Sequence, residues 1–480
     1  MCLFLKAKFV QTMKNTKKIG KDDPRRIVHS IKVGLALTLY DGFGQAGMWA
    51  VLTVVVVFEY TVGGTICKSL NRGGATLLAG ALGVGAAYLA SLCGDRGEPF
   101  VLGILVFILA AVSTFTRFFP NVKRRYDYGV LIFILTFSLV AVSGSQVTEI
   151  LQLARQRLAT ILIGGATCIV ISISVGPVWA GQDLHNLVAG NIDKLADFLQ
   201  GFEGEICSCS RDEIRMLSSK DTKEKTLLQG YKSVLNSKAT EESLANFAWW
   251  EPGHGRFRLH HPWKQYLKIG SLVRECACLM ETLMGCIDSK SQVGPSDFHL
   301  KIQPACVKMC TESSKALKEL ASAVKSMSTF PLSATETHVR RSKAAADHLK
   351  AIVENSDFPA KTELGEIMHL LVAASVLVDV IKCVEKLSDS INELSQKARF
   401  EKPESTASPD KQQHLLIHRG IVKPVVDNRV LNEIGETRGD PPEIFKKLRP
   451  ENCVHVVNIE SSETTFENKN PHGTERVIVV

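Results

Sequence analysis

The residues of this sequence that are best suited to chemistry are cations that lie inside or beside long apolar segments. Lys32 lies within an apolar stretch, and Arg117 follows another. A charge at such a position is costly in a membrane unless it faces a protein-lined or water-filled interior. Rings of Lys or Arg side chains serve pores that pass anions. Both residues are therefore candidates to line an anion pore.

Four more arginines are candidates for the entrances of such a pore: Arg124, Arg125, Arg155 and Arg157. For Arg124 and Arg125 the alternative is an anchor that holds the cytosolic end of a span at the membrane surface. Glu59 lies late in an apolar segment, where a carboxylate usually pairs with a base. We expect Glu59 to form a gating pair with Lys32 or Arg117.

No set of residues indicates an enzyme, a metal site or a cofactor. The glycines at 80, 83 and 85 lie in an apolar helical segment rather than after a strand, so they form no phosphate loop. The pairs Cys207/Cys209 and Cys276/Cys278 lack a second pair or a His at zinc-ligand spacing. The thirteen cysteines are expected to be reduced thiols in the cytosol. Residues 250–261 carry carboxylate and imidazole groups, but no nucleophile is placed beside them. We therefore expect these residues to form a structural turn rather than a catalytic site.

The elements that must position the charged residues are apolar segments about as long as a bilayer is thick. About twenty apolar residues of helix cross the hydrocarbon core. Five segments reach or approach this length: residues 48–62, 73–93, 100–115, 128–142 and 158–178. Two stripes of small residues, at 75, 79, 83 and 87 and at 164, 168, 172 and 176, predict close helix packing. The predicted fold class is all-α, with a polytopic membrane domain at residues 27–180.

The distribution of Lys and Arg orients these spans. Basic residues concentrate in the N-terminal arm, residues 1–26, and in connectors at 68–72 and 117–125. By the positive-inside rule these segments are cytosolic, and so are both termini. The same rule accounts for the net charge of +8, so no nucleic-acid partner is expected. It also requires a sixth span at residues 27–39, which rises only about 20 Å as a helix.

The remaining part of the chain has a different period. Between residues 181 and 398, apolar residues recur at i, i+3, i+4 and i+7 with charged opposite faces, which predicts a cytosolic helical bundle. Residues 367–381 are apolar enough for another span. Because Glu366, His369 and Asp379 interrupt them, we expect a core helix instead. Residues 399–480 are polar and contain several prolines, and we expect them to be largely disordered.

Seven runs of residues resemble one family, the plant aluminium-activated malate transporters. The runs are MWAVLTVVVVFE (48–59), KSLNR (68–72), FTRFFP (115–120), YDYGVLIFILTFS (126–138), PVWAGQDLH (177–185), WEPGHGRF (250–257) and HPWKQY (261–266). The resemblance covers about residues 22–396 and implies a plant anion channel that passes malate and often chloride or nitrate. It also implies a homodimer with six spans per subunit and a pore lined from both subunits.

The resemblance gives roles to further residues. Malate is a dianion, which the cationic candidates above would hold. Aluminium activation in relatives resembles the capture of a trivalent cation by external carboxylates, and Asp41 and Glu149 are the candidates here. Gln152 stands where relatives often have another acid, so aluminium sensitivity is not expected. Relatives also have about ten more residues after the position of Leu39, nearly three helical turns. Their loss shortens the first span and predicts weak conduction or none.

Three functional hypotheses follow from the sequence. The first is passive, voltage-driven efflux of malate and inorganic anions by a homodimer in a lipid membrane, with the plasma membrane favoured over the vacuolar membrane. The second is a proton-coupled exporter of organic or aromatic acids, which needs an intramembrane acid, and Glu59 is the one residue that qualifies. The third is a non-conducting subunit, because the first span is short.

Overall fold

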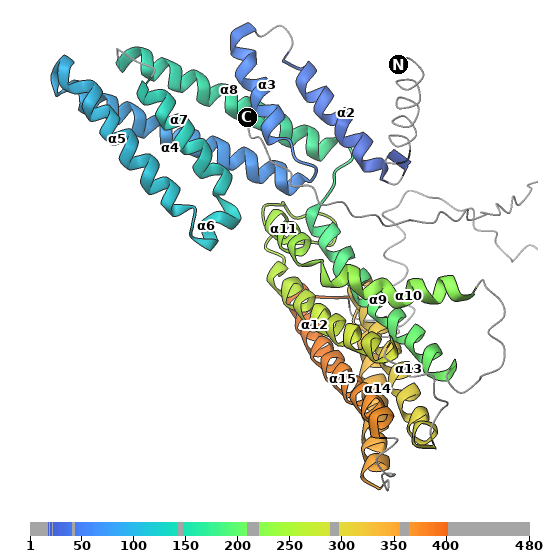
Figure 1. Cartoon of the computed structure of the whole chain (residues 1–480). Coiled ribbons are helices and arrows are strands. Elements are labelled where there is room, and N and C mark those ends of the chain that lie inside the picture. Colours follow the sequence, from blue (N-terminus) through green and yellow to red (C-terminus); the bar gives the residue numbers. More distant parts are fainter. Residues whose placement is uncertain are drawn as a thin grey trace, which may run out of the picture. The chain divides into compact units, whose positions relative to one another are not determined.

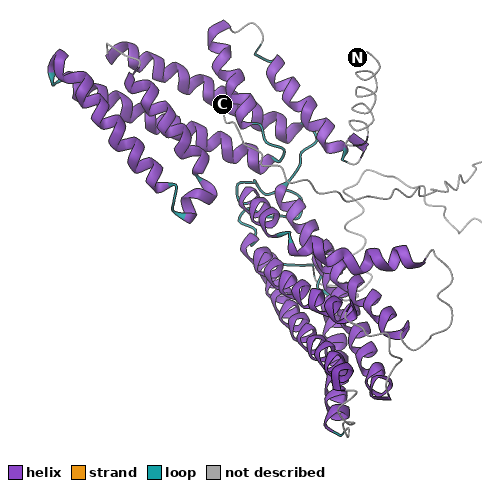
Figure 2. Ribbon diagram, viewed as in Figure 1, coloured by secondary structure: helices purple, strands orange, loops and turns teal. Residues whose placement is uncertain are grey.

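The structure is a computed structural model that describes most of the chain as far as residue 401. The described residues are 18, 20–21, 23–40, 44–142, 147–208, 220–288, 297–355 and 364–401. Helices account for nearly all of this part, and no strand occurs in it (Figures 1 and 2). The predicted all-α fold class is therefore confirmed.

Each of the six predicted spans falls on a helix. The helices are α2 (Pro24–Thr38), α3 (Gly44–Val57), α4 (Val62–Ser91), α5 (Gly94–Thr116), α7 (Asp127–Val142) and α8 (Val147–Ser174), with the short α6 (Pro120–Arg125) before α7. Three segments are long and apolar enough to cross a bilayer: Val62–Ser91, Arg96–Thr116 and Ala154–Ser174. The apolar stretches Gly47–Val57 and Asp127–Ala141 are shorter.

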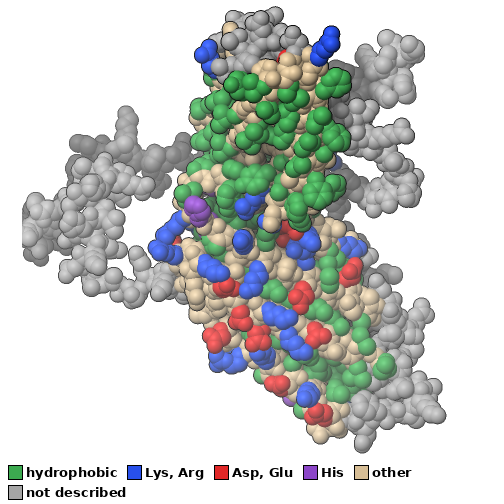
Figure 3. All heavy atoms as spheres, turned by 90° about the vertical axis from the view of Figure 1, so that its left-hand side faces the viewer, with side chains coloured by type: hydrophobic (Ala, Val, Ile, Leu, Met, Phe, Trp, Pro, Cys, Tyr) green, Lys and Arg blue, Asp and Glu red, His purple; other side chains and the backbone are tan. Residues whose placement is uncertain are grey.

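The surface of these helices is largely apolar. Figure 3 shows hydrophobic side chains over the upper part of one face, with charged side chains gathered below them. On α5 the exposed side chains include Phe100, Phe107 and Phe115. An outward apolar surface of this extent fits contact with lipid rather than water.

Helix α4 begins well before the predicted span. The sequence placed Lys68 and Arg72 in a connector and began the span at residue 73, and this boundary is wrong. Thr61 caps the helix, because its side chain accepts a hydrogen bond from the N–H of Gly64 at 3.1 Å. The basic residues that follow are thus helical, and Arg72 is buried.

Helix α2 begins as the sequence predicts. Asp23 caps it by accepting a hydrogen bond from the N–H of Arg25 at 3.1 Å, and Pro24 occupies the first turn. The fifteen residues of the helix rise about 22 Å, less than the hydrocarbon core of about 30 Å. One face buries Lys32 and Ala36.

Small residues let the apolar helices pack closely. A Cβ atom added to Gly83 of α4 would lie 2.6 Å from Cγ1 of Val140 on α7. One added to Gly164 of α8 would lie 3.1 Å from Cβ of Thr53 on α3. The two predicted stripes of small residues do pack against neighbouring helices at these points.

The second part of the chain is a helical bundle. It contains α9 (Ala180–Ser208), α10 (Lys220–Leu235), α11 (Lys238–Ala248), α12 (Trp263–Asp288), α13 (Asp297–Ser326), α14 (Phe330–Glu354) and α15 (Leu364–Ala398). Its core includes Leu199, Tyr266, Leu320 and Leu387. In α15 the residues Leu377, Val380 and Ile381 are buried in this core, as predicted for residues 367–381.

The folded bundle reaches slightly beyond the predicted boundary at residue 398. Phe400 is buried, and the carbonyl of Glu401 accepts a hydrogen bond from the N–H of Thr329 at 3.0 Å. The rest of the segment predicted to be disordered, residues 402–480, lies outside the described residues.

Candidate functional site

Arg72 is the first of two arginines on the long apolar helices whose Nε atoms are buried. It lies in the third turn of α4 and is 6% exposed. Its Nη1 donates a hydrogen bond to the hydroxyl of Tyr128 on α7 at 3.1 Å. Its Nε is buried and has no partner among the described residues. An arginine with a free N–H in an apolar setting is costly to bury and well suited to hold an anion.

Arg157 of α8 is the second. Its guanidinium lies over the ring of Trp49 on α3, with 4.3 Å between the guanidinium carbon and the ring centroid. This is a cation–π contact, which stabilises the cation without using its N–H donors. Its Nε is also buried and unpartnered within the described part of the chain. Arg157 therefore keeps hydrogen-bonding capacity for a ligand.

The interface between α4 and α8, which we call the α4–α8 seam, fixes the relative levels of the two arginines, whose side chains contact α7 (Arg72) and α3 (Arg157) beside it. A Cβ on Gly73 would lie 3.2 Å from Leu162, and one on Gly80 would lie 3.7 Å from Ala154. The helices are thus antiparallel, and Arg157 stands level with about residue 77 of α4. Arg72 and Arg157 are therefore separated by roughly 7 Å along the helix axis.

Two hydroxyls share the buried face of α4 with Arg72. Ser69 and Thr76 lie three and four residues from it, and both are buried. Neither side-chain oxygen has a hydrogen-bond partner among the residues that the structure describes. Guanidinium and hydroxyl donors on one seam form a surface that can replace part of the hydration shell of an anion.

Lys32, a predicted pore residue, is buried and bonded to backbone carbonyl groups. It is 1% exposed, and its Nζ donates to the carbonyl oxygens of Gly176 at 2.9 Å and Ser172 at 3.4 Å. These carbonyls belong to the C-terminal end of α8, where a cation is favourable. The contact attaches α2 to α8, and a role of Lys32 in a pore stays a prediction.

Arg117 and Glu59 do not form the predicted pair. Arg117 binds both carboxylate oxygens of Asp127, at 2.7 and 3.2 Å, and so joins the end of α5 to the start of α7. Glu59 forms an ion pair with Lys68. The predicted pairing of Glu59 with Lys32 or Arg117 is wrong, because Glu59 lies beyond the end of α3, beside the first turns of α4.

The remaining candidates lie away from the α4–α8 seam or outside the described part. Arg124 and Arg155 are exposed, and the guanidinium of Arg125 lies over the ring of Trp249, 4.4 Å from its centroid. Asp41 lies outside the described residues, and so does the side chain of Glu149. Their roles as entrance residues and as external cation sensors stay predictions.

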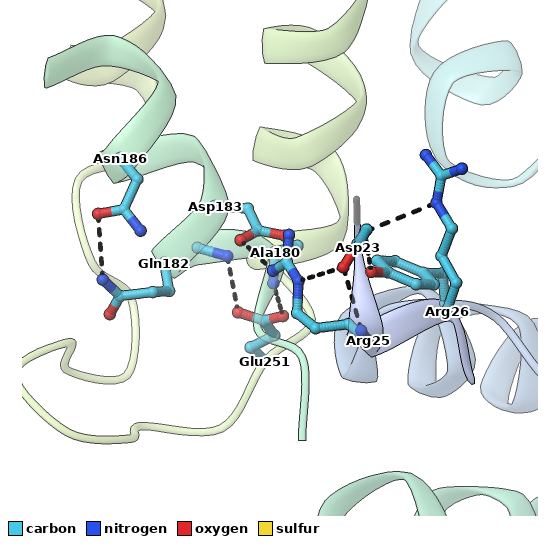
Figure 4. Close-up of polar contacts among 10 residues, drawn as sticks. Asp23, Arg25, Arg26, Ala180, Gln182, Asp183, Asn186 and Glu251 are labelled. Carbon is cyan, nitrogen blue, oxygen red and sulfur yellow. Dashed lines mark hydrogen bonds and ion pairs between the residues drawn. The ribbon is translucent and has the colours of Figure 1, made fainter. Parts of the chain in front are cut away.

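A carboxylate joins the apolar helices to the bundle. Glu251 is 5% exposed and accepts hydrogen bonds from the N–H groups of Ala180 at 2.6 Å and Gly181 at 3.0 Å (Figure 4). It also accepts one from the N–H of Gly63 at 3.3 Å. These donors belong to the first turns of α9 and α4, where helix N–H groups lack helical partners. Burial raises the pKa of Glu251 to about 7, and the three N–H donors oppose this rise.

A second link lies next to it. Arg25 of α2 forms an ion pair with Asp183 of α9, with 2.9 Å between Nη1 and Oδ1 (Figure 4). The hydroxyl of Tyr60 donates to Asp23 at 2.9 Å. The predicted structural turn at residues 250–261 is thus one side of a polar junction between α2, α4 and α9.

The family of this protein follows from comparison with known proteins. The family model described as "Aluminium activated malate transporter" matches residues 17–360. The chain belongs to this family. Its relatives are named as transporters and not as enzymes, so the chain is no enzyme, as expected. With its apolar helices, it is a membrane protein.

Curated relatives match most of the chain. Aluminum-activated malate transporter 2 of Arabidopsis thaliana is 42% identical over 480 residues, covering 96% of this chain and 94% of the relative. Aluminum-activated malate transporter 7 of the same plant is 45% identical over 423 residues, with 81% and 83% covered. Aluminum-activated malate transporter 1 of Triticum aestivum is 44% identical over 436 residues, with 86% and 92% covered.

Proposed function

We propose that this protein provides a passive, voltage-driven pathway for malate and for smaller anions such as chloride and nitrate. The observation that carries the proposal is the pair formed by buried Arg72 and half-buried Arg157, whose Nε donors are buried and have no partner within the described residues. The names of the relatives supply the substrate, because they are malate transporters.

The electrostatics of the seam support this assignment. Two unit charges about 4 Å apart interact by about 4 kcal/mol at an effective dielectric constant near 20. A dianion beside two guanidinium groups would gain enough to offset part of its lost hydration. Two sites on neighbouring helices, offset by roughly 7 Å along the helix axis, also allow an anion to leave more easily than one deep site would.

The same proposal includes the assembly and its orientation. A homodimer in the plasma membrane with both termini in the cytosol fits the basic residues of α6 and of the first turns of α4. The homodimer also accounts for the apolar outer face of α2, where Ile27, Ile31 and Leu35 are exposed and would contact lipid or the second subunit.

Malate release from proteoliposomes tests the mechanism. The full chain, and a form with ten apolar residues inserted after Leu39, are reconstituted in malate-loaded liposomes, and a potassium gradient with valinomycin sets the membrane potential. We expect release that follows the voltage and needs no proton gradient. Malate release that requires a proton gradient and does not change with the voltage would support the proton-coupled exporter instead.

A second candidate function rests on the length of α2. It has fifteen residues, and of the helices that fall on predicted spans only α3, with fourteen, is shorter. A chain with so short a first span can be a subunit that assembles without conducting. In that case the lengthened form releases malate and the unaltered chain does not.

A further inference from the structure

A basic cavity lies outside the α4–α8 seam, where α4, α6, α7 and α11 meet. It has a volume of about 430 Å³. Four cations line it: Lys68, Lys123, Arg124 and Arg125. The two acids among its lining residues are Asp127 and Glu242, and Arg117 already neutralises Asp127. The cavity therefore has an excess of positive charge.

The three cations of α6 are available to a ligand. Within the described residues, none of them takes part in an ion pair, unlike Lys68, which binds Glu59. Lys123 and Arg124 are exposed at the opening. Arg125 stacks on Trp249, which fixes its guanidinium but leaves its charge uncompensated.

The backbone of α6 is held in place from two sides. The side-chain amide of Asn71 on α4 donates to the carbonyl of Arg125 at 3.0 Å, and that of Asn246 on α11 donates to the carbonyl of Arg124 at 2.9 Å. Both amides also line the cavity. The cations are thus presented by a fixed short helix, which lowers the entropy lost when they bind a ligand.

The residues before α6 place the cavity at the membrane surface. Phe118 and Phe119 directly precede the helix and are 78% and 52% exposed. They follow α5, whose outer face is apolar. Exposed aromatic rings next to basic residues mark the interface between lipid tails and headgroups. A ligand in this cavity would therefore lie at the level of lipid headgroups.

We propose that this cavity binds the phosphorylated headgroup of an inositol phospholipid. Arg pairs with phosphate through two parallel hydrogen bonds, and basic pockets between helices at a membrane surface recognise such headgroups. A volume of about 430 Å³ suits one ring with its phosphates. Tyr128 lines the cavity and accepts the hydrogen bond from Arg72, so the headgroup would lie one residue from the α4–α8 seam.

Binding to the purified full chain in detergent tests this proposal without any transport measurement. The probe is short-chain phosphatidylinositol bisphosphate, and the variant is Lys123→Gln with Arg124→Gln, whose side chains are exposed. The matched control is Arg340→Gln with Lys350→Gln on α14, also exposed. We expect saturable binding that weakens about tenfold or more in the first variant and is unchanged in the control.

Three results would overturn the proposal. Equal affinity in the Lys123/Arg124 variant would exclude the cavity as the site. Equal affinity for short-chain phosphatidylserine would indicate general attraction to anionic lipid rather than a headgroup site. Binding of soluble inositol trisphosphate with the affinity of the lipid would assign the cavity to a free phosphorylated ligand instead.

Discussion

At the scale of single residues, the feature that separates Arg72 from Lys32 and Arg117 is the set of atoms that its side chain contacts. Lys32 and Arg117 are satisfied by carbonyl and carboxylate oxygens, whereas Arg72 meets one hydroxyl and keeps a free, buried Nε within the described part. A satisfied cation holds helices together, and an unsatisfied one can bind a ligand.

Substitution of Arg72 tests this distinction. A hydrogen bond from a charged group is worth about 1.5–3 kcal/mol, so Arg72→Gln should lower malate conductance about tenfold or more in patch recordings of the chain lengthened after Leu39. Arg72→Lys should retain an intermediate conductance because it keeps the charge. Arg340→Gln, an exposed arginine of the bundle, is the control. Wild-type conductance in Arg72→Gln, at equal surface expression, would remove Arg72 from the site.

Glu251 makes the stability of the junction depend on pH. Its pKa in the folded chain, about 7, lies above its ordinary value of 4.5. The folded chain therefore holds this proton more tightly than the unfolded chain does. The contribution to stability is fully present below about pH 4.5 and is lost as the pH rises through about 7.

Thermal unfolding of the solubilised protein measures this effect. Between about pH 5 and about pH 8, the wild-type midpoint should fall more than that of Glu251→Gln, by an amount equivalent to at most roughly 3 kcal/mol. Glu251→Gln should also be less stable throughout, because an amide cannot accept all three N–H bonds. Parallel pH profiles for the two proteins would refute the role of the carboxyl group.

At the scale of elements, α2 is one of three helices on predicted spans, with α3 and α7, that rise less than the hydrocarbon core is thick. Its rise of about 22 Å leaves about 8 Å of hydrocarbon unmatched. Backbone groups drawn into that region lack hydrogen-bond partners, and thinning of the bilayer relieves only part of the cost.

An insertion after Leu39 tests the consequence. Ten apolar residues there should raise the malate current well above that of the unaltered chain, and ten Gly and Ser residues, the control, should not. Cell-surface labelling shows whether delivery of the three proteins is equal. An unaltered chain that already carries the full current would show that the short helix is harmless.

Helix α9 offers a matched pair of glycines for a test of packing at the junction. A Cβ on Gly181 would lie 2.5 and 2.7 Å from ring atoms of Trp263, whereas nothing lies within 4 Å of one on Gly190. Gly181→Ala should lower the free energy of unfolding by about 1–3 kcal/mol. Gly190→Ala should be neutral or stabilising, because Ala favours the helix. A stable Gly181→Ala variant would contradict the packing described here.

The positions of most helices and of their buried faces could be predicted from sequence, because they depend on local patterns. The apolar runs, the cap at Asp23 and the buried stripe of α15 are periodic or local signals, and each falls where the pattern predicts. The start of α4 was missed because two basic residues were assigned to a connector. The cap at Thr61, followed by a run without proline, was the signal that could have placed it.

Pairing between helices could not be predicted in the same way. That Glu59 meets Lys68, and that Lys32 meets the end of α8, depends on how helices are aligned in space. Residue spacing along one helix carries no such information. For the same reason the relative levels of Arg72 and Arg157 follow only from the contacts of Gly73 and Gly80, which align α4 with α8.

At the scale of the whole molecule, the described chain joins an apolar helical part to a bundle through short polar contacts. Glu251 and the ion pair between Arg25 and Asp183 connect α2, α4 and α9. The contacts of Glu251 thus connect the bundle to α4, the helix that carries Arg72. The proposed pathway for anions requires that α4 lines it.

The reversal potential of the current under a malate gradient tests that claim most directly. It is recorded from the chain lengthened after Leu39 and from the same chain with Arg72→Gln and Arg157→Gln. We expect the current of the lengthened chain to reverse near the malate equilibrium potential at any imposed proton gradient, and the double variant to carry little or no malate current. A malate-selective current of wild-type size in the double variant would contradict the proposed pathway.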